Sequence, residues 1–208
     1  MTHPLRTVRT RSRPSILVAV RGAGVAALLA GMLLALLPLG PAEAARPDRA
    51  DRAADWETTQ LERGRIRSVA FDATDWGLTV DTYFALVAAG NHPKQARTVI
   101  RTVSKKVRTY VSSSGDFFAG PVAKALLARR VAGLDPSIAS ASLNLRRKLV
   151  SLIAGSGRVR DSGQNDYSNS ITQSLSVLAL ARSGRLRPST VDYLVRQQCA
   201  RGHFRLQM

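Results

Sequence analysis

The chain has 208 residues and a formal net charge of +17, with 31 lysines and arginines against 14 aspartates and glutamates. This length is enough for one domain with one hydrophobic core. Because Cys199 is the only cysteine, an internal disulfide is excluded and stability has to come from packing.

The first 44 residues have the pattern of a signal peptide. A basic leader contains Arg6, Arg9, Arg11 and Arg13, an apolar run extends from Gly24 to Leu39, and Ala42-Glu43-Ala44 supplies a small-x-small cleavage pattern. The alternative is an uncleaved membrane anchor, since Leu17 to Leu39 approaches the length of a span apart from Arg21. We therefore expect a secreted or envelope-associated protein that contacts a membrane only if this segment is retained.

Removal of residues 1–44 leaves a net charge of about +13. This charge is compatible with an anionic partner such as an envelope polymer or lipid head groups, while export argues against nucleic acid. Residues 45–55 are rich in Pro, Arg and Asp and are expected to be a disordered leader.

Residues 56–208 read as a series of helices. The expected helices are 56–63, 78–89, 92–111, 121–132, 140–153, 170–183 and 189–198, with loops between them. Helices 78–89 and 170–183 are apolar on more than one side, as buried helices are, whereas 92–111 and 140–153 are amphipathic. Asn169 or Ser170 can cap the helix over 170–183, and Gly184 can end it.

A Gly-x-apolar signature recurs along the chain at steps of 51, 42 and 45 residues. It stands at Gly64-Arg-Ile66, Gly115-Asp-Phe117, Gly157-Arg-Val159 and Gly202-His-Phe204. Periods of this size indicate stacked helical hairpins. The alternation of buried and amphipathic helices predicts an all-α fold, an α/α toroid-like stack of about three hairpins forming a partial barrel. An open solenoid of shorter repeats is the second choice.

The segment Gln198-Cys-Ala-Arg-Gly202-His-Phe204 resembles the Gln-x-x-Asp-Gly-Gly-Phe repeat of the squalene cyclase and protein prenyltransferase superfamily. Residues 77–86 and 166–173 are similar to the inner-helix starts of exported bacterial members with prenyltransferase/squalene oxidase repeats. The resemblance covers residues 56–208 and implies the α/α toroid. Arg201 and His203 depart from the repeat. Only about three hairpins are present, and half a toroid would leave inner helices exposed, so we expect a truncated chain, with closure by a partner as the alternative.

Enzymes of this superfamily use either an Asp-x-Asp-Asp motif to protonate an alkene or a zinc-bound Asp, Cys and His set. Neither is found in this sequence, so no catalytic residue, metal ligand or cofactor is assigned. One alternative function is therefore a fragment of such an enzyme that lacks its catalytic motif, and another is a structural module of the cell envelope.

The resemblance extends to non-catalytic toroids that bind a ligand at the mouth of the barrel. It implies binding of an apolar or amphipathic ligand, or of a protein partner, by side chains near the starts of the inner helices. These ligand-binding residues are Trp76, Asp81, Tyr83, Asp116, Asp166, Tyr167, Asn169 and Gln173. Taken singly, Trp76 and Tyr167 are equally explained as loop anchors, and Gln173 as a satisfied core amide.

Overall fold

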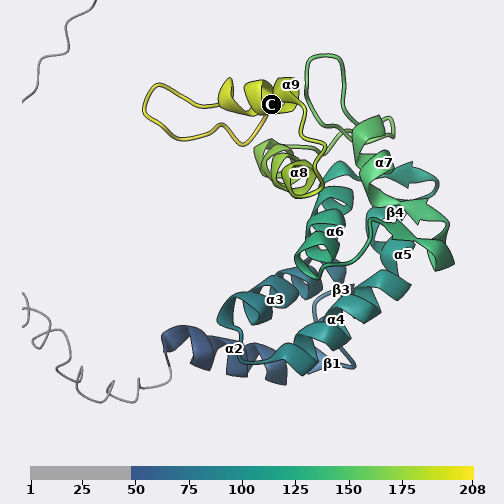
Figure 1. Cartoon of the computed structure of the whole chain (residues 1–208), viewed down its shortest axis with the longest axis vertical. Helices are drawn as coiled ribbons and strands as arrows, with labels where there is room; N and C mark the ends of the chain where they lie inside the picture. Colours follow the sequence, from purple (N-terminus) through teal and green to yellow (C-terminus); the bar gives the residue numbers. More distant parts are fainter. Residues whose placement is uncertain (1–47) are drawn as a thin grey trace, which may run out of the picture. The chain divides into compact units, whose positions relative to one another are not determined.

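The computed structural model describes residues 48–208, and the expected signal peptide, residues 1–44, lies outside them. All described residues belong to one compact unit, Pro47–Met208. This unit is a succession of helical hairpins joined by short strands (Figure 1).

Eight α-helices lie in residues 48–208. They are α2 (Arg49–Thr59), α3 (Trp76–Ala89), α4 (Pro93–Lys105), α5 (Val107–Val111), α6 (Ala119–Val131), α7 (Leu145–Ser151), α8 (Ser170–Arg182) and α9 (Pro188–Val195). Helix α3 packs against α2, α4 and α6, helix α6 packs against α5, α7 and α8, and α8 packs against α9. Each hairpin thus contacts chiefly its neighbours in the chain. None of these eight helices is long and apolar enough to span a membrane.

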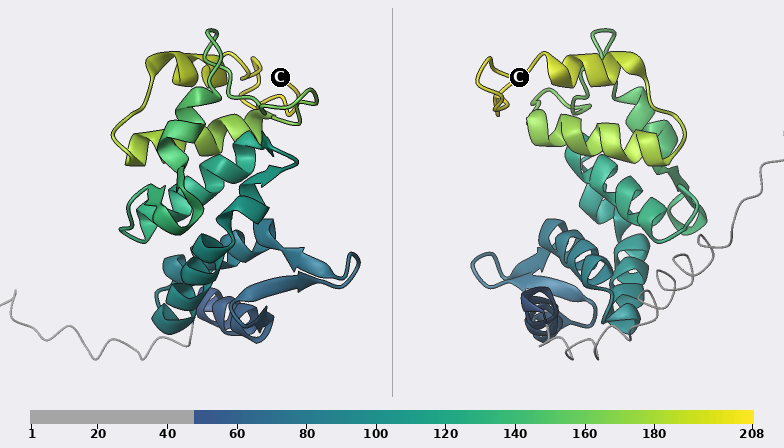
Figure 2. Two further views of the ribbon diagram at one scale, coloured as in Figure 1. Left: turned by 90° about the vertical axis from the view of Figure 1, so that its right-hand side faces the viewer. Right: turned by 60° about the vertical axis from the view of Figure 1, so that its left-hand side comes forward.

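Three small antiparallel sheets contradict the expected all-α class and make the described unit a mixed α and β structure. The first contains β1 (Leu61–Glu62), β2 (Arg65–Ser68) and β3 (Ala73–Asp75), the second β4 (Ser112–Ser113) and β5 (Asp116–Phe117), and the third β6 (Ser137–Ile138) and β7 (Leu143–Asn144). Figure 2 shows the β2–β3 hairpin projecting from the helices beside it. The expected toroid is not confirmed.

Most strands form where the sequence predicts loops, but β1 and β7 lie within the helices expected over 56–63 and 140–153. Ser114 and Gly115 have φ of 51° and 91°, and two consecutive residues with positive φ are typical of a two-residue hairpin turn. This turn pairs Ser112 with Phe117. The other Gly-x-apolar segments make the same kind of pair, Leu61 with Ile66, Ile153 with Val159, and Gln198 with Phe204. Strands of two residues are too short to show a period of two, so the sequence pattern could not reveal them.

Several helix boundaries also differ from expectation: α2 ends at Thr59 instead of residue 63, and the helix expected over 92–111 is divided at Lys106 into α4 and α5. Helix α2 begins at Arg49, within the segment 45–55 expected to be disordered, and is held because Ala54 is buried and Glu57 accepts a hydrogen bond from Thr82. The helix expected over 140–153 begins only at Leu145. A hairpin occupies its first turn, and the Asn144 side chain caps α7 by accepting a hydrogen bond from the amide of Arg147.

The buried apolar residues form two clusters. One lies among α2, α3 and α4 and includes Val80, Leu86 and Val99; the other lies among α5, α6, α7 and α8 and includes Leu126 and Leu149. Tyr110 packs against both clusters, and α6 contributes to both because its Ala128 belongs to the first. Burial raises the pKa of the Tyr110 hydroxyl, and the charges of Asp81 and Asp75 raise it further.

Candidate functional site: an apolar pocket with two arginines

An open pocket of about 560 Å³ lies between the end of α3, the first turns of α4 and the segment after α6. Its lining consists of Tyr83, Leu86, Val87, Gly90, Pro93, Ala96, Arg97, Ile100, Arg101, Ala132 and Leu134. The volume is within the range of small-molecule sites, about 300–1,000 Å³. Since most of these side chains are apolar, the pocket suits a largely apolar ligand.

The local sequence explains the shape of the pocket. Gly90 ends α3 with a φ of 78°, and Pro93 starts α4 directly afterwards, so the two helices form a tight hairpin. The segment after α6 forms the third side of the pocket, and Leu134 holds it in place. The Leu134 amide donates to the carbonyl of Arg129, and the Leu134 carbonyl accepts from Arg130 Nη1 at 3.1 Å. The walls are therefore held by backbone geometry and by side-chain hydrogen bonds.

Two cations complete the lining. Arg97 and Arg101 lie one helical turn apart on α4 and are both exposed. Neither guanidinium forms a hydrogen bond or an ion pair with another residue in the described part of the chain. An apolar wall next to two uncompensated positive charges is complementary to a molecule with an apolar body and an acidic head.

Tyr83 is the one expected ligand-binding residue that lies in this pocket. Its side chain is 3% exposed, its ring contacts that of Phe84, and burial raises the pKa of its hydroxyl. Tyr83 therefore enters the pocket as a neutral group.

Trp76 and Asp81 lie elsewhere on α3. Trp76 is the first residue of the helix and packs against the cluster among α2, α3 and α4. Asp81 Oδ2 accepts a charge-assisted bond of 2.6 Å from Lys124 Nζ, which also donates to the carbonyl of Gly77 at 3.1 Å. This pair joins α3 to α6, so Asp81 has a structural partner that the sequence did not indicate.

Asp166 and Asn169 stabilise the backbone before and at the start of α8. Asn169 Oδ1 accepts hydrogen bonds from the amides of Ile171 and Thr172, which confirms it as the cap of α8. Asp166 accepts from the amides of Asp161 and Ser168, and its second oxygen pairs with an arginine, Arg158, at 2.9 Å. Partial burial alone would raise the pKa of Asp166, but these hydrogen bonds and the arginine outweigh it and lower the pKa.

Asp161 is a buried residue that the sequence analysis missed. Its carboxylate accepts a 2.6 Å hydrogen bond from the amide of Ala119, the first residue of α6, and a 3.0 Å bond from the amide of Tyr167. It therefore caps a helix that lies 42 residues earlier in the chain. No local spacing could indicate this contact, because the cap and the helix are joined only by the fold.

Gln173 is fully buried, does not line the pocket, and joins α8 to the neighbouring backbone by hydrogen bonds. Its Oε1 accepts from the amide of Val159, and its Nε2 donates to the carbonyls of Gly157 and Thr190, each at 2.9 Å. The equivalent position of α3 acts similarly, since Thr79 Oγ1 accepts from the amide of Ile66 at 2.9 Å. In both places a polar side chain four residues after the helix cap holds the apolar residue of the preceding Gly-x-apolar segment.

Asp116 and Tyr167 lie together in a separate, more polar hollow of about 340 Å³. The remaining lining comes from Ser113, Ser114, Phe118, Gly163, Gln164 and Asn165. Asp116 packs so closely on Gly163 that a side chain there would clash with its carboxylate. Of the eight expected ligand-binding residues, the structure thus places one in the apolar pocket and two in this hollow.

Arg97 and Arg101 were not predicted as pocket residues, because the amphipathic pattern of 92–111 places its charged residues on the solvent side of the helix. Their signal was the four-residue spacing beside an apolar stripe, which puts both on one edge of α4. Sequence alone could not show that the end of α3 and the segment after α6 meet that edge.

Within residues 48–208 no group of three or more His, Cys, Asp or Glu side chains is arranged to hold a metal ion. Cys199 is half-buried, and its amide donates to the carbonyl of His203 at 2.8 Å. Comparison of the chain with protein-family models, curated proteins and solved structures gave no match.

Proposed function

We propose that the protein is a non-catalytic binding protein for an anionic amphiphile, a molecule with an alkyl chain and one acidic head group. The alkyl chain lies in the pocket between α3 and α4, and the head group lies at Arg97 and Arg101. The observation that carries this proposal is the combination of an apolar lining with two arginines that have no partner in the described part of the chain.

We also propose that the protein is exported and that it is related to proteins with prenyltransferase/squalene oxidase repeats. Residues 1–44 support export by their charge, apolar run and small-x-small pattern. The relation is supported by the four Gly-x-apolar segments, because the apolar residue of each pairs with a residue near the end of the preceding helix.

The proposal is tested by measuring the affinities of straight-chain carboxylic acids and the matching alcohols for the full chain by titration calorimetry. Each buried methylene contributes about 0.8 kcal/mol, so affinity should rise about fourfold for each added carbon until the pocket is full. The acid should bind more tightly than the alcohol of equal length.

Paired variants show whether this binding takes place in the pocket. Val87→Gln places an amide in the pocket wall, whereas Leu78→Gln makes a similar change on the same helix at an exposed position outside the lining. We expect at least a fivefold loss of dodecanoate affinity for Val87→Gln and less than twofold for Leu78→Gln. Equal losses would contradict the assignment of the pocket.

The head-group site is tested with Arg97→Gln/Arg101→Gln. Exposed ion pairs are worth about 0.2–1 kcal/mol each, so the double variant should bind dodecanoate roughly two- to thirtyfold more weakly. Its affinity for dodecanol should be unchanged. If the double variant loses affinity equally for the acid and the alcohol, the arginines do not bind the acidic head group.

A further inference from the structure

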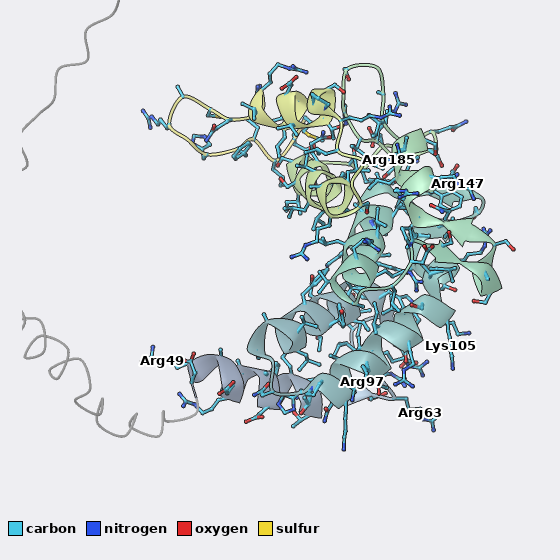
Figure 3. The ribbon with its side chains drawn as sticks, viewed as in Figure 1. Arg49, Arg63, Arg97, Lys105, Arg147 and Arg185 are labelled. Atoms are coloured by element: carbon cyan, nitrogen blue, oxygen red, sulfur yellow. The ribbon has the colours of Figure 1, made fainter. Side chains whose placement is uncertain are left out.

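A second groove, of about 800 Å³, lies between α7 and the turn that joins α8 to α9. Four arginines line it, Arg146 and Arg147 from the first turn of α7 and Arg185 and Arg187 from the turn. No acidic side chain is among the described residues of its lining. Figure 3 shows Arg147 and Arg185 at the same end of the described unit.

Several other arginines in the described part of the chain are bonded to protein groups. Arg129 and Arg130 donate to carbonyls around the ends of α6 and α8, Arg158 pairs with Asp166, and Arg196 donates to the carbonyl of Ser156. Their charges and donors are therefore used to hold the fold.

The groove arginines differ from these. The guanidinium groups of Arg147, Arg185 and Arg187 form no hydrogen bond or ion pair with another residue in the described range. Arg146 is closer to an acid: the hydrogen bonds of Ser137 lower the pKa of Asp135, and the charges of Arg129 and Arg146 lower it further. At least three of the four cations thus face the groove without a compensating charge.

Both walls of the groove are held in place by backbone bonds. On one side Gly184, with a φ of 64°, ends α8, and the amide of Arg185 bonds back to the carbonyl of Leu180 at 3.0 Å. This closes the turn in the manner of a Schellman motif. On the other side the Asn144 cap fixes the start of α7 beneath Arg147. Because the backbone of the walls is fixed before a ligand arrives, binding has to order chiefly the arginine side chains.

We propose that this groove binds a ligand that carries adjacent phosphate groups. Arginine is suited to this task because its planar guanidinium makes paired hydrogen bonds to phosphate oxygens. Four arginines on two facing walls provide charge and donors for two or three phosphates at once. A single carboxylate would leave most of this charge unmatched.

This groove is independent of the proposed amphiphile pocket. No residue lines both, and the pocket is formed by α3, α4 and the segment after α6. A failure of one proposal therefore leaves the other intact, and variants in each site serve as controls for the other.

The experiment titrates the full chain with sodium tripolyphosphate by calorimetry at a fixed ionic strength near 0.15 M, where long-range attraction between exposed charges is screened. Arg147→Gln/Arg185→Gln should lower the affinity at least tenfold. Arg97→Gln/Arg101→Gln removes the same amount of charge elsewhere and should change the affinity less than twofold. Equal losses in the two variants would overturn the proposal, because they would show that net charge alone attracts the ligand.

Two further probes identify the chemistry and the source of the phosphate. Citrate carries three carboxylates and no phosphate; it should bind at least tenfold more weakly than tripolyphosphate, and equal affinity would overturn phosphate recognition. Vesicles of phosphatidic acid in phosphatidylcholine present the phosphate as a lipid head group. If Arg147→Gln/Arg185→Gln weakens the binding of tripolyphosphate but not of the vesicles, the source is a free oligophosphate; if it weakens both, a phosphorylated lipid surface also binds at the groove. If neither probe distinguishes this variant from the control, the proposal is wrong.

Discussion

Replacement of Gln173 by leucine tests the hydrogen bonds that join α8 to its neighbours. Gln173→Leu keeps the side-chain size but removes the acceptor of the Val159 amide and the donor to the Gly157 carbonyl, which has no other donor among the described residues. Each buried group left unpaired costs about 1–3 kcal/mol, and the more apolar leucine returns roughly 1 kcal/mol. We expect a loss of about 3 kcal/mol, a large share of the 5–15 kcal/mol typical of a domain.

The assay is denaturant unfolding of the full chain followed by circular dichroism, with hydrogen exchange at the Val159 amide as a local readout. Ser176→Ala is the matched control, since Ser176 is equally buried on α8 but its hydroxyl bonds only to the carbonyl of Thr172 in the same helix. This control should lose less than about 1 kcal/mol. A loss below 1 kcal/mol for Gln173→Leu, or unchanged exchange at Val159, would refute the reasoning.

Two further substitutions test the turns around α8. Gly157→Ala and Gly115→Ala both introduce a side chain at positive φ, which costs about 1–2 kcal/mol, but only at Gly157 would the new Cβ overlap the backbone carbonyl of Ser189. Gly157→Ala should therefore be the more destabilising by about 1–3 kcal/mol in thermal unfolding, and equal effects would show that α9 moves aside. Because the pKa of Asp166 is lower in the folded chain than its ordinary value of 3.8, its carboxylate stabilises the fold above about pH 4, and this contribution is lost as the pH falls through the folded pKa. Asp166→Asn should thus differ from the wild type in unfolding free energy near pH 7 and approach it in acid; a difference that is constant with pH would contradict this.

Helix α8 was the element that sequence reasoning described best. Its cap at Asn169 and its end near Gly184 are confirmed, because both depend on residues within a few positions of each other. The burial of its side chains was less predictable. Ile171 and Leu178 were expected to be buried on an apolar helix, yet they are 60% and 54% exposed, since α6 and α9 leave one side of α8 open among the described residues.

The same limit explains the outcome at the candidate sites. The repetition of the Gly-x-apolar segments was recognised from the sequence. Their pairing as strands was not predicted, because a strand of two residues is too short to show an alternating pattern. The pocket and the arginine groove are each built from segments far apart in the chain, so Arg97 and Arg147 gave only the local signal of a charge on a helix. Sequence reasoning reached the positions that make local contacts and missed those defined by long-range ones.

Helix α6 belongs to both apolar clusters, with Ala128 on one side and Leu126 on the other. In a nearest-neighbour description, the energy of the unit is a sum of the hairpins and their interfaces, and α6 carries the interface term between the two halves. Substitutions in the outer hairpins then affect packing only locally, whereas substitutions in α6 affect the packing of both halves.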